Sequence, residues 1–258
     1  MFLAYRIPFP PAKGNKIRAF HILRYLSSRY QVHLGCFIDD VSDEQYFASL
    51  REICAEVFLA PLSRMKKIMG GLQGLSLGRS ITEGSYSDVA MRTWIYETLY
   101  KNDIEDVFVY CSAMAPYVFG IETGNRVVID MVDVDSAKWD AYGREARWPL
   151  NQLYFLEKSR VSVLEKRAVV SCDRALFVSR AEVEEFLKLA PELSGRVGYL
   201  ENGVDFNWFN PHAEYPNPFE PCKPSIVFTG VMNYKPNIDA VVWFADEVLP
   251  SIQHERPA

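Results

Sequence analysis

The 258-residue sequence lacks the patterns that mark membrane-spanning, secreted and zinc-binding proteins. No apolar run approaches the roughly 18–20 residues that a bilayer-spanning helix needs, and no basic segment followed by an apolar core opens the chain. The five cysteines contain no C-x-x-C pair, and the four histidines have no spacing that suits a metal or a catalytic triad. We therefore expect a cytoplasmic protein with reduced cysteines and no metal. The cysteines are Cys36, Cys54, Cys111, Cys172 and Cys222, and the histidines are His21, His33, His212 and His254.

An excess of positive charge is also missing. The chain has 28 lysines and arginines against 33 acidic residues, which gives a net charge of −5. Nucleic-acid binders carry a basic surface, so no nucleic-acid partner is expected. Hydrophobic residues make up 49% and charged residues 24% of the chain, proportions that are ordinary for a globular α/β domain.

The first 28 residues predict a strand, a tight loop and a helix. Residues 2–5 are apolar, a proline-rich turn follows, and apolar residues recur at helical spacing from Ala19 to Leu26. A loop that ends at a helix N-terminus favours an anion, and glycine lets a ligand approach the backbone closely. We weigh a phosphate site here against a solvated helix start whose lysines serve solubility. The candidate phosphate-binding residues are Lys13, Gly14, Asn15 and Arg18, with Lys16 adding charge.

Apolar runs alternate with helical patterns along the rest of the first 210 residues. This alternation predicts an α/β fold, a Rossmann-like parallel sheet with helices on both faces. Ser42 and Ser179 are expected to cap helices. Strands are expected at 32–38, 57–59, 107–110, 126–131, 175–178 and 197–200, and helices at 43–54, 87–101, 112–120, 148–172 and 180–189.

The composition changes after residue 210. Residues 211–224 are rich in proline and predict a linker. Beyond it we expect a strand at 226–228 and a helix from Asn237 to about Leu249, which form a strand–helix fragment of a second domain (225–258). One strand and one helix cannot close a domain, so we expect that the sequence stops within it. The helix is apolar on nearly all sides, and we expect residues 225–252 to fold back on the first domain or to pair with a second copy as a homodimer.

Three aspartates follow the expected strand at 126–131. Asp130, Asp133 and Asp135 lie at the edge where ligands bind in open α/β sheets. Clustered carboxylates can position a substrate hydroxyl or raise one another's pKa, which makes Asp133 and Asp135 the candidate catalytic residues. The alternative is turn and capping chemistry, in which aspartate is common.

Residues 63–79 mix basic and apolar side chains and contain four glycines. Surfaces that rest on anionic membranes have this composition, so peripheral contact with the inner face of the membrane is one interpretation. A loop–helix segment packed on the domain is the other.

Four segments resemble bacterial family 4 (group 1) glycosyltransferases, with the closest likeness to the sugar transferases associated with exosortase/PEP-CTERM and exopolysaccharide systems. These segments are 9–18 (FPPAKGNKIR), 37–40 (FIDD), 201–205 (ENGVD) and 228–239 (FTGVMNYKPNID). The likeness extends over essentially the whole chain, and the last segment is the most specific.

The resemblance implies a GT-B glycosyltransferase, in which two Rossmann-like domains face a cleft. The N-terminal domain would hold a glycan or lipid-linked acceptor, and the C-terminal domain would hold a nucleotide sugar. Transfer would retain the anomeric configuration and need no cofactor or metal. By the same resemblance Asn202, Gly203, Asp205 and Gly230 would border the cleft, although an Asn-Gly pair can also be a bare turn. The family's donor-gripping basic residues and paired glutamates would lie past Ala258, so this chain is expected to be inactive alone.

Three alternatives stay open. The first is a nucleotide-sugar epimerase of the same two-domain architecture, and the second is a non-catalytic sugar- or nucleotide-binding module. The third is an NAD-linked reductase, but the first loop has no G-x-G-x-x-G pattern, which counts against a dinucleotide site.

Overall fold

The computed structural model describes residues 1–11, 14–121, 124–207, 209–219, 224–232 and 235–255. The chain divides into two compact units, Met1–Asn202 and Gly203–Ala258. The second unit begins eight residues before the linker boundary that the sequence suggests. Each unit is described by itself.

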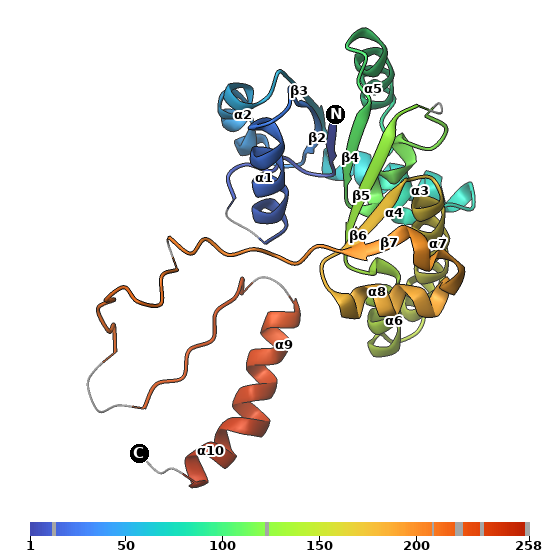
Figure 1. Ribbon diagram of the computed structural model, residues 1–258. Helices are drawn as coiled ribbons and strands as arrows, with labels where there is room; N and C mark the ends of the chain where they lie inside the picture. Colours follow the sequence, from blue (N-terminus) through green and yellow to red (C-terminus); the bar gives the residue numbers. More distant parts are fainter. Residues whose placement is uncertain (12–13, 122–123, 208, 220–223, 233–234, 256–258) are drawn as a thin grey trace. The chain divides into compact units, whose positions relative to one another are not determined.

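The first unit is built on a seven-stranded sheet in which every neighbouring pair is parallel (Figure 1). The strand order is β3-β2-β1-β4-β5-β6-β7, so the prediction of a Rossmann-like parallel sheet is confirmed. Its strands are β1 (Phe2–Ala4), β2 (His33–Ile38), β3 (Glu56–Pro61), β4 (Asp106–Tyr110), β5 (Arg126–Val132), β6 (Arg174–Phe177) and β7 (Val197–Tyr199).

Helices cover both faces of this sheet, and alternate strand residues pack against each layer. Phe2 and Ala4 join the apolar cluster that contains residues of α1 (Gly14–Ser27) and α2 (Phe47–Ile53). Leu3 belongs to the other cluster, which contains residues of α5 (Val89–Lys101), α7 (Leu150–Val170) and α8 (Arg180–Leu189). Successive side chains of a strand point to opposite faces, so the short central strand β1 is buried on both.

Side-chain caps set the start of four helices. Each capping oxygen accepts a hydrogen bond from the N–H three residues further on, which satisfies a donor that the helix itself leaves unpaired. The prediction for Ser179 before α8 is confirmed. The other three are Ser63 before α3 (Arg64–Ser76), Ser80 before α4 (Ile81–Ser85) and Asp88 before α5.

Two local predictions were wrong, and other elements were not predicted. Ser42 does not cap a helix; Asp40 accepts from the Ser42 N–H at 3.0 Å and opens a 3-10 turn, η1 (Val41–Tyr46), that precedes α2. The segment after β4 is a 3-10 turn, η2 (Ser112–Tyr117), because Pro116 lacks the N–H that an α-helix would need. A helix that the apolar pattern does not show, α6 (Asp135–Glu145), follows β5, and another 3-10 turn, η3 (Pro191–Arg196), leads into β7.

The second unit contains a helical segment and no sheet among its described residues. The prediction of a strand at 226–228 was wrong: residues 224–229 have no regular secondary structure. No strand in the described ranges pairs with them, and a strand forms only when its N–H and C=O groups find partners. The helical segment consists of α9 (Lys235–Trp243), a π-helical turn, η4 (Phe244–Val248), and α10 (Leu249–Glu255). The expected helix is therefore present, with a π-turn inside it.

Candidate functional site

The strand order places a topological switch point between β1 and β4. From β1 the chain builds the sheet outward through β2 and β3, and from β4 it builds in the other direction. Crossovers on the two sides of this point leave in opposite directions, which opens a crevice at the carboxyl ends of the strands where α/β proteins bind ligands. The predicted residues at the start of α1 and after β5 lie at this edge.

A cavity of about 540 Å³ lies beside the carboxyl ends of β1 and β2, lined by Arg6, Pro10, Lys16, Asp39, Asp40, Val41 and Asp43. Asp39 accepts hydrogen bonds from Arg6 at 2.6 Å and from Lys67 at 3.0 Å. Burial favours the neutral acid, but the bond from Lys67 and the charge of Arg6 outweigh it and lower the pKa of Asp39. The Arg6 Nε is buried and has no hydrogen-bond partner among the described residues.

A buried ion pair joins α1 to β5. The Arg18 Nε and NH2 donate to the two carboxylate oxygens of Asp130 at 2.8 and 3.2 Å, and NH1 donates to the Asn202 Oδ1 at 3.0 Å. The side chains of Arg18 and Asp130 are 6% and 0% exposed. Burial raises the pKa of Asp130, and the bonds from Arg18 oppose that rise. Arg18 and Asn202 are therefore in contact. The positive charge of Arg18 is already paired with the buried Asp130 carboxylate.

The Asn202-Gly203 pair forms no turn, since residues 201–205 have neither a turn nor regular secondary structure. This removes the bare-turn alternative. In the second unit, Asp205 accepts from the Asn207 N–H at 2.9 Å. A Cβ on Gly230 would lie 2.8 Å from the Asn237 side chain, so a larger residue would displace that side chain from the start of α9.

The start of α1 has open space beside it. Gly14 is exposed, a Cβ there would meet no atom within 4 Å, and the first turn holds no acidic residue. Lys16 donates to Asp43 at 2.7 Å, and both side chains are largely buried. Lys13 and the side chain of Asn15 lie outside the described residues.

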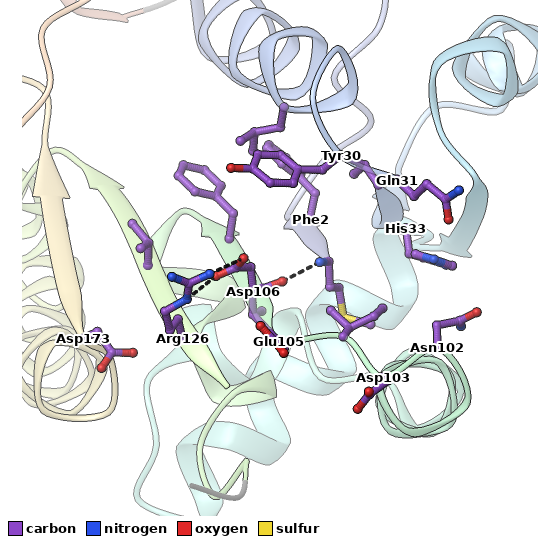
Figure 2. A pocket seen from close by; sticks show the side chains of 17 residues that line it. Phe2, Tyr30, Gln31, His33, Asn102, Asp103, Glu105, Asp106, Arg126 and Asp173 are labelled. Atoms are coloured by element: carbon purple, nitrogen blue, oxygen red, sulfur yellow. Dashed lines mark hydrogen bonds and ion pairs between the residues drawn. The ribbon is translucent and has the colours of Figure 1, made fainter. Parts of the chain in front are cut away.

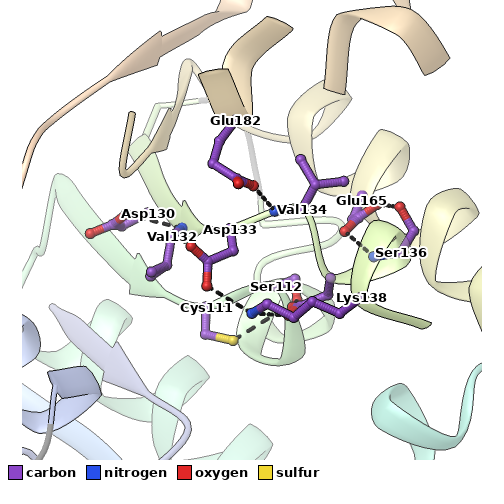
Figure 3. Close-up of polar contacts among 11 residues, drawn as sticks. Cys111, Ser112, Asp130, Val132, Asp133, Val134, Ser136, Lys138, Glu165 and Glu182 are labelled. Carbon is purple, nitrogen blue, oxygen red and sulfur yellow. Dashed lines mark hydrogen bonds and ion pairs between the residues drawn. The ribbon is translucent and has the colours of Figure 1, made fainter. Parts of the chain in front are cut away.

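The two candidate catalytic carboxylates share one ammonium group (Figure 3). Lys138 donates to Asp133 at 2.7 Å and to Asp135 at 3.2 Å, and the Ser112 hydroxyl donates to Asp135 at 2.7 Å. Burial lowers the pKa of Lys138, but the Asp135 and Asp133 carboxylates outweigh it, so its pKa is raised. The side chains of Asp133 and Asp135 are 35% and 25% exposed. Both carboxylates are therefore partly open to solvent, although neither lines the 540 Å³ cavity.

The N–H groups at the start of α6 are occupied by the protein's own carboxylates (Figure 3). Glu182 accepts from the Val134 N–H at 2.6 Å, and Glu165 accepts from the Ser136 N–H at 3.0 Å and its hydroxyl at 2.6 Å. Burial raises the pKa of Glu165 to about 7, although the bonds from Ser136 lower it. The start of α6 is thus closed to an external phosphate, unlike the start of α1.

Strained backbone marks the same edge. Cys111 and Val132, at the ends of β4 and β5, have φ angles of +80° and +68°, and they are two of the three non-glycine residues with positive φ in the described ranges. A bulge lies between Asp130 and Val132. Such conformations cost about 1–3 kcal/mol each and gather at functional sites. Nothing in the sequence of either strand predicts them.

A second cavity, about 710 Å³, lies at the opposite edge of the sheet (Figure 2). The residues that line it include Met1, Tyr30, His33 and the exposed Arg126–Asp106 ion pair. None of the predicted site residues lines either cavity, but Lys16, which adds charge at the start of α1, lines the smaller one. Ligands of parallel sheets bind beyond the carboxyl ends of the strands, and this cavity lies at their amino ends, so the smaller cavity is the better candidate.

Within the described ranges, no group of three or more His, Cys, Asp or Glu residues is placed to hold a metal ion. In the same part of the chain, no helix is both long enough and apolar enough to cross a membrane.

The chain is similar to known proteins at the level of solved structures. No family model matches the chain, and no curated protein matches it. Among solved structures it is similar to UGT73P12 of Glycyrrhiza uralensis complexed with glycyrrhetinic acid 3-O-monoglucuronide, with 12% identity and a TM-score of 0.39. The likeness covers 82% of this chain and 50% of that one, so the chain spans about half the length of that structure.

Proposed function

We propose that this chain is the acceptor-side part of a retaining glycosyltransferase, which moves a sugar from a nucleotide sugar to a glycan or lipid-linked acceptor in polysaccharide biosynthesis. The observation that carries the proposal is the accessible pair Asp133 and Asp135, held by Lys138 at the carboxyl edge beside the switch point. The resemblance of four segments to family 4 glycosyltransferases supplies the reaction class.

The carboxylate pair has the chemistry that an acceptor hydroxyl needs. A carboxylate accepts the hydroxyl hydrogen bond and orients the oxygen toward the face of the sugar from which the diphosphate departs, as retention in one step requires. The hydroxyl proton then passes to the departing diphosphate oxygen as the new glycosidic bond forms. The nucleoside diphosphate leaves from the sugar carbon with the electron pair of the broken bond. Lys138 ties the two carboxylates to α6, and Ser112 ties Asp135 to η2, so the pair is held by two elements.

The leaving diphosphate needs positive charge on the other side of the crevice. Helix α1 offers N–H groups at its start and open space next to Gly14. Lys13 is the basic residue nearest that start in the sequence. Arg18 has a positioning role in this proposal, because its guanidinium holds Asp130 and Asn202.

Saturation-transfer NMR with a panel of soluble oligosaccharides tests the acceptor assignment on this chain. We expect glycan signals that the Asp133→Asn/Asp135→Asn variant loses, because asparagine keeps the shape but not the charge. Asp103→Asn, at the opposite edge of the sheet, is the matched control and should keep them. Absence of any glycan signal, or signals that survive in the double variant, would contradict the assignment.

Product analysis separates the alternatives. We expect no turnover of UDP- or GDP-sugars by this chain alone, because the resemblance assigns most of the donor grip to the second domain. Conversion of a nucleotide sugar to its epimer, without an acceptor product, would establish the epimerase instead. Glycan binding that needs neither Asp133 nor Asp135 would favour the non-catalytic module.

A further inference from the structure

Helix α3 packs on the first unit through glycines. Gly71 and Gly74 are buried, and a Cβ on Gly74 would lie 2.8 Å from the Ser80 carbonyl oxygen. A Cβ on Gly70 would lie 2.4 Å from the carbonyl oxygen of Gly84 in α4. With no side chains between them, α3 and α4 approach backbone to backbone. The large side chains of α3 are therefore free to lie on its other face.

That other face is apolar and exposed. Met65, Ile68, Met69 and Leu72 follow the i, i+3, i+4, i+7 spacing that places them on one stripe. Their exposed fractions are 65%, 50%, 64% and 61%. A helix on the surface of a globular domain normally turns such a stripe inward. Here the glycine face is inside and the apolar stripe faces out.

Basic residues flank the stripe. The sequence of α3 contains Arg64, Lys66 and Lys67 and no acidic residue. Successive helical residues are about 100° apart, so Arg64 and Lys66 lie on opposite sides of Met65. Both are exposed; the Lys66 side chain is 56% exposed, lies 3.7 Å from the Asp88 carboxylate and donates to the Pro61 carbonyl oxygen at 3.2 Å. Lys67 points to the domain, where it donates to Asp39 at 3.0 Å.

The stripe is already formed and held in place. Ser63 caps the start of α3, and Arg160 donates to the carbonyl oxygens of Leu75 and Arg79 near its end, at 3.1 and 2.9 Å. Glu157 accepts from two N–H groups of α4, which anchors the partner helix. Docking would therefore require no folding of the helix.

We propose that α3 is a membrane-docking helix that lies in the headgroup region of an anionic bilayer. Four large apolar side chains enter the acyl boundary, and Arg64 and Lys66 contact lipid phosphates on either side. The charge pattern favours this occupant over a second copy of the chain. In a symmetric contact between two α3 helices, the cations of one helix would face the same cations of the other. Lys67 links the helix to Asp39, so docking would bring the carboxyl edge of the sheet close to the lipid surface.

Co-sedimentation of the whole chain with vesicles tests the proposal, which is independent of the proposed sugar transfer. We expect binding to phosphatidylcholine vesicles that contain phosphatidylglycerol, weak binding to pure phosphatidylcholine, and loss of binding as ionic strength rises. Equal binding to both vesicles, or to neither, would overturn it. If the stripe instead joins two copies, Met69→Ser/Leu72→Ser will lower the mass that light scattering measures for the chain, and the vesicles will not bind.

The apolar part is tested with Met69→Ser/Leu72→Ser. Removal of two inserted side chains should weaken vesicle binding by about tenfold or more. The matched control is Val163→Ser/Val170→Ser, which changes two exposed apolar residues of α7 (55% and 59%) and should bind as the unchanged chain does. Equal losses in both variants would show that the contact is not specific to α3.

The charged part is tested with Arg64→Gln/Lys66→Gln. Each basic residue near an anionic surface contributes about fivefold to binding, so the pair should weaken it by about 25-fold. Arg180→Gln/Lys188→Gln removes two exposed cations from α8 and is the control. A loss in the control that matches the loss in the α3 variant would mean that binding follows total charge, which would overturn the assignment to α3.

Discussion

The Arg18 guanidinium and the Asp130 carboxylate meet at 2.8 Å across 112 positions of sequence. The same guanidinium reaches Asn202, the last residue of the first unit. One buried side chain on α1 thereby fixes the end of β5 and the segment after β7 relative to each other. Because Asp133 and Asp135 follow Asp130 closely in sequence, we infer that this ion pair holds the segment with the candidate catalytic carboxylates in place.

Removal of Arg18 should destabilise the first unit strongly. In Arg18→Ala the Asp130 carboxylate would remain fully buried with no cation, a situation that typically costs about 3–5 kcal/mol. Urea denaturation followed by circular dichroism measures the free energy of unfolding.

The control is Arg126→Ala. Arg126 pairs with Asp106 at 2.7 Å, but both side chains are exposed, at 70% and 56%. Water replaces the lost partner there, so Arg126→Ala should lower the free energy of unfolding much less than Arg18→Ala does. Equal effects of the two substitutions would show that burial of the Arg18–Asp130 pair does not govern its contribution.

Glu165 should make the protein less stable as pH rises. Its pKa is raised from 4.5 to about 7 by burial, so between these values the folded chain holds a proton that the unfolded chain has released. The free energy of unfolding therefore falls as pH rises through this window, by about 3 kcal/mol in total from this group. Glu165→Gln should flatten the decline between pH 4.5 and 7, measured by urea denaturation at a series of pH values.

Ser136→Ala provides the opposite change at the same site. The Ser136 hydroxyl donates to Glu165 and lowers its pKa, so its loss should raise the pKa further. The decline in stability should then continue to a higher pH than in the unchanged chain. If Glu165→Gln leaves the pH dependence as it is, another group causes it.

Gly84→Ala should separate α4 from α3. A Cβ at this position would lie 2.2 Å from the Gly70 carbonyl oxygen, and the backbone cannot rotate away as a side chain can. Overpacking of this kind costs about 1–3 kcal/mol, which should appear as a lower melting temperature. Gly195→Ala is the control, since a Cβ there would meet nothing within 4 Å. The same shift in both variants would show that close helix packing is not the cause.

Much of the sheet could be predicted because its signal is local. Apolar runs such as the one in β2 are buried on both faces, and a fully buried strand needs continuous apolar character. The start of α8 was visible for the same reason, because the Ser179 cap acts within three residues. At the edge of the site, the aspartates after β5 were found by their position alone.

The partners of those residues could not be predicted in the same way. Arg18 appeared to be a surface cation near a phosphate site, because its carboxylate lies 112 residues away in sequence. Helix α6 was missed, and with it the i, i+3 pair of Asp135 and Lys138 that such a helix brings together. The strain at Val132 depends on tertiary packing, which no local propensity reports.

The helical segment of the second unit should associate with a copy of itself. Its apolar side chains include Val242 at 52% and Trp243 at 61% exposure, preceded by Val227 at 59%. Burial of a large apolar side chain contributes about 1.5–3 kcal/mol, and a symmetric dimer buries the same patch twice. We expect the whole chain to scatter light as a dimer, and Val242→Ser/Trp243→Ser to scatter as a monomer. Phe206→Ser, at a residue that is 75% exposed but lies outside 225–252, should remain dimeric. A whole chain that is monomeric at every concentration would contradict self-association through this helical segment.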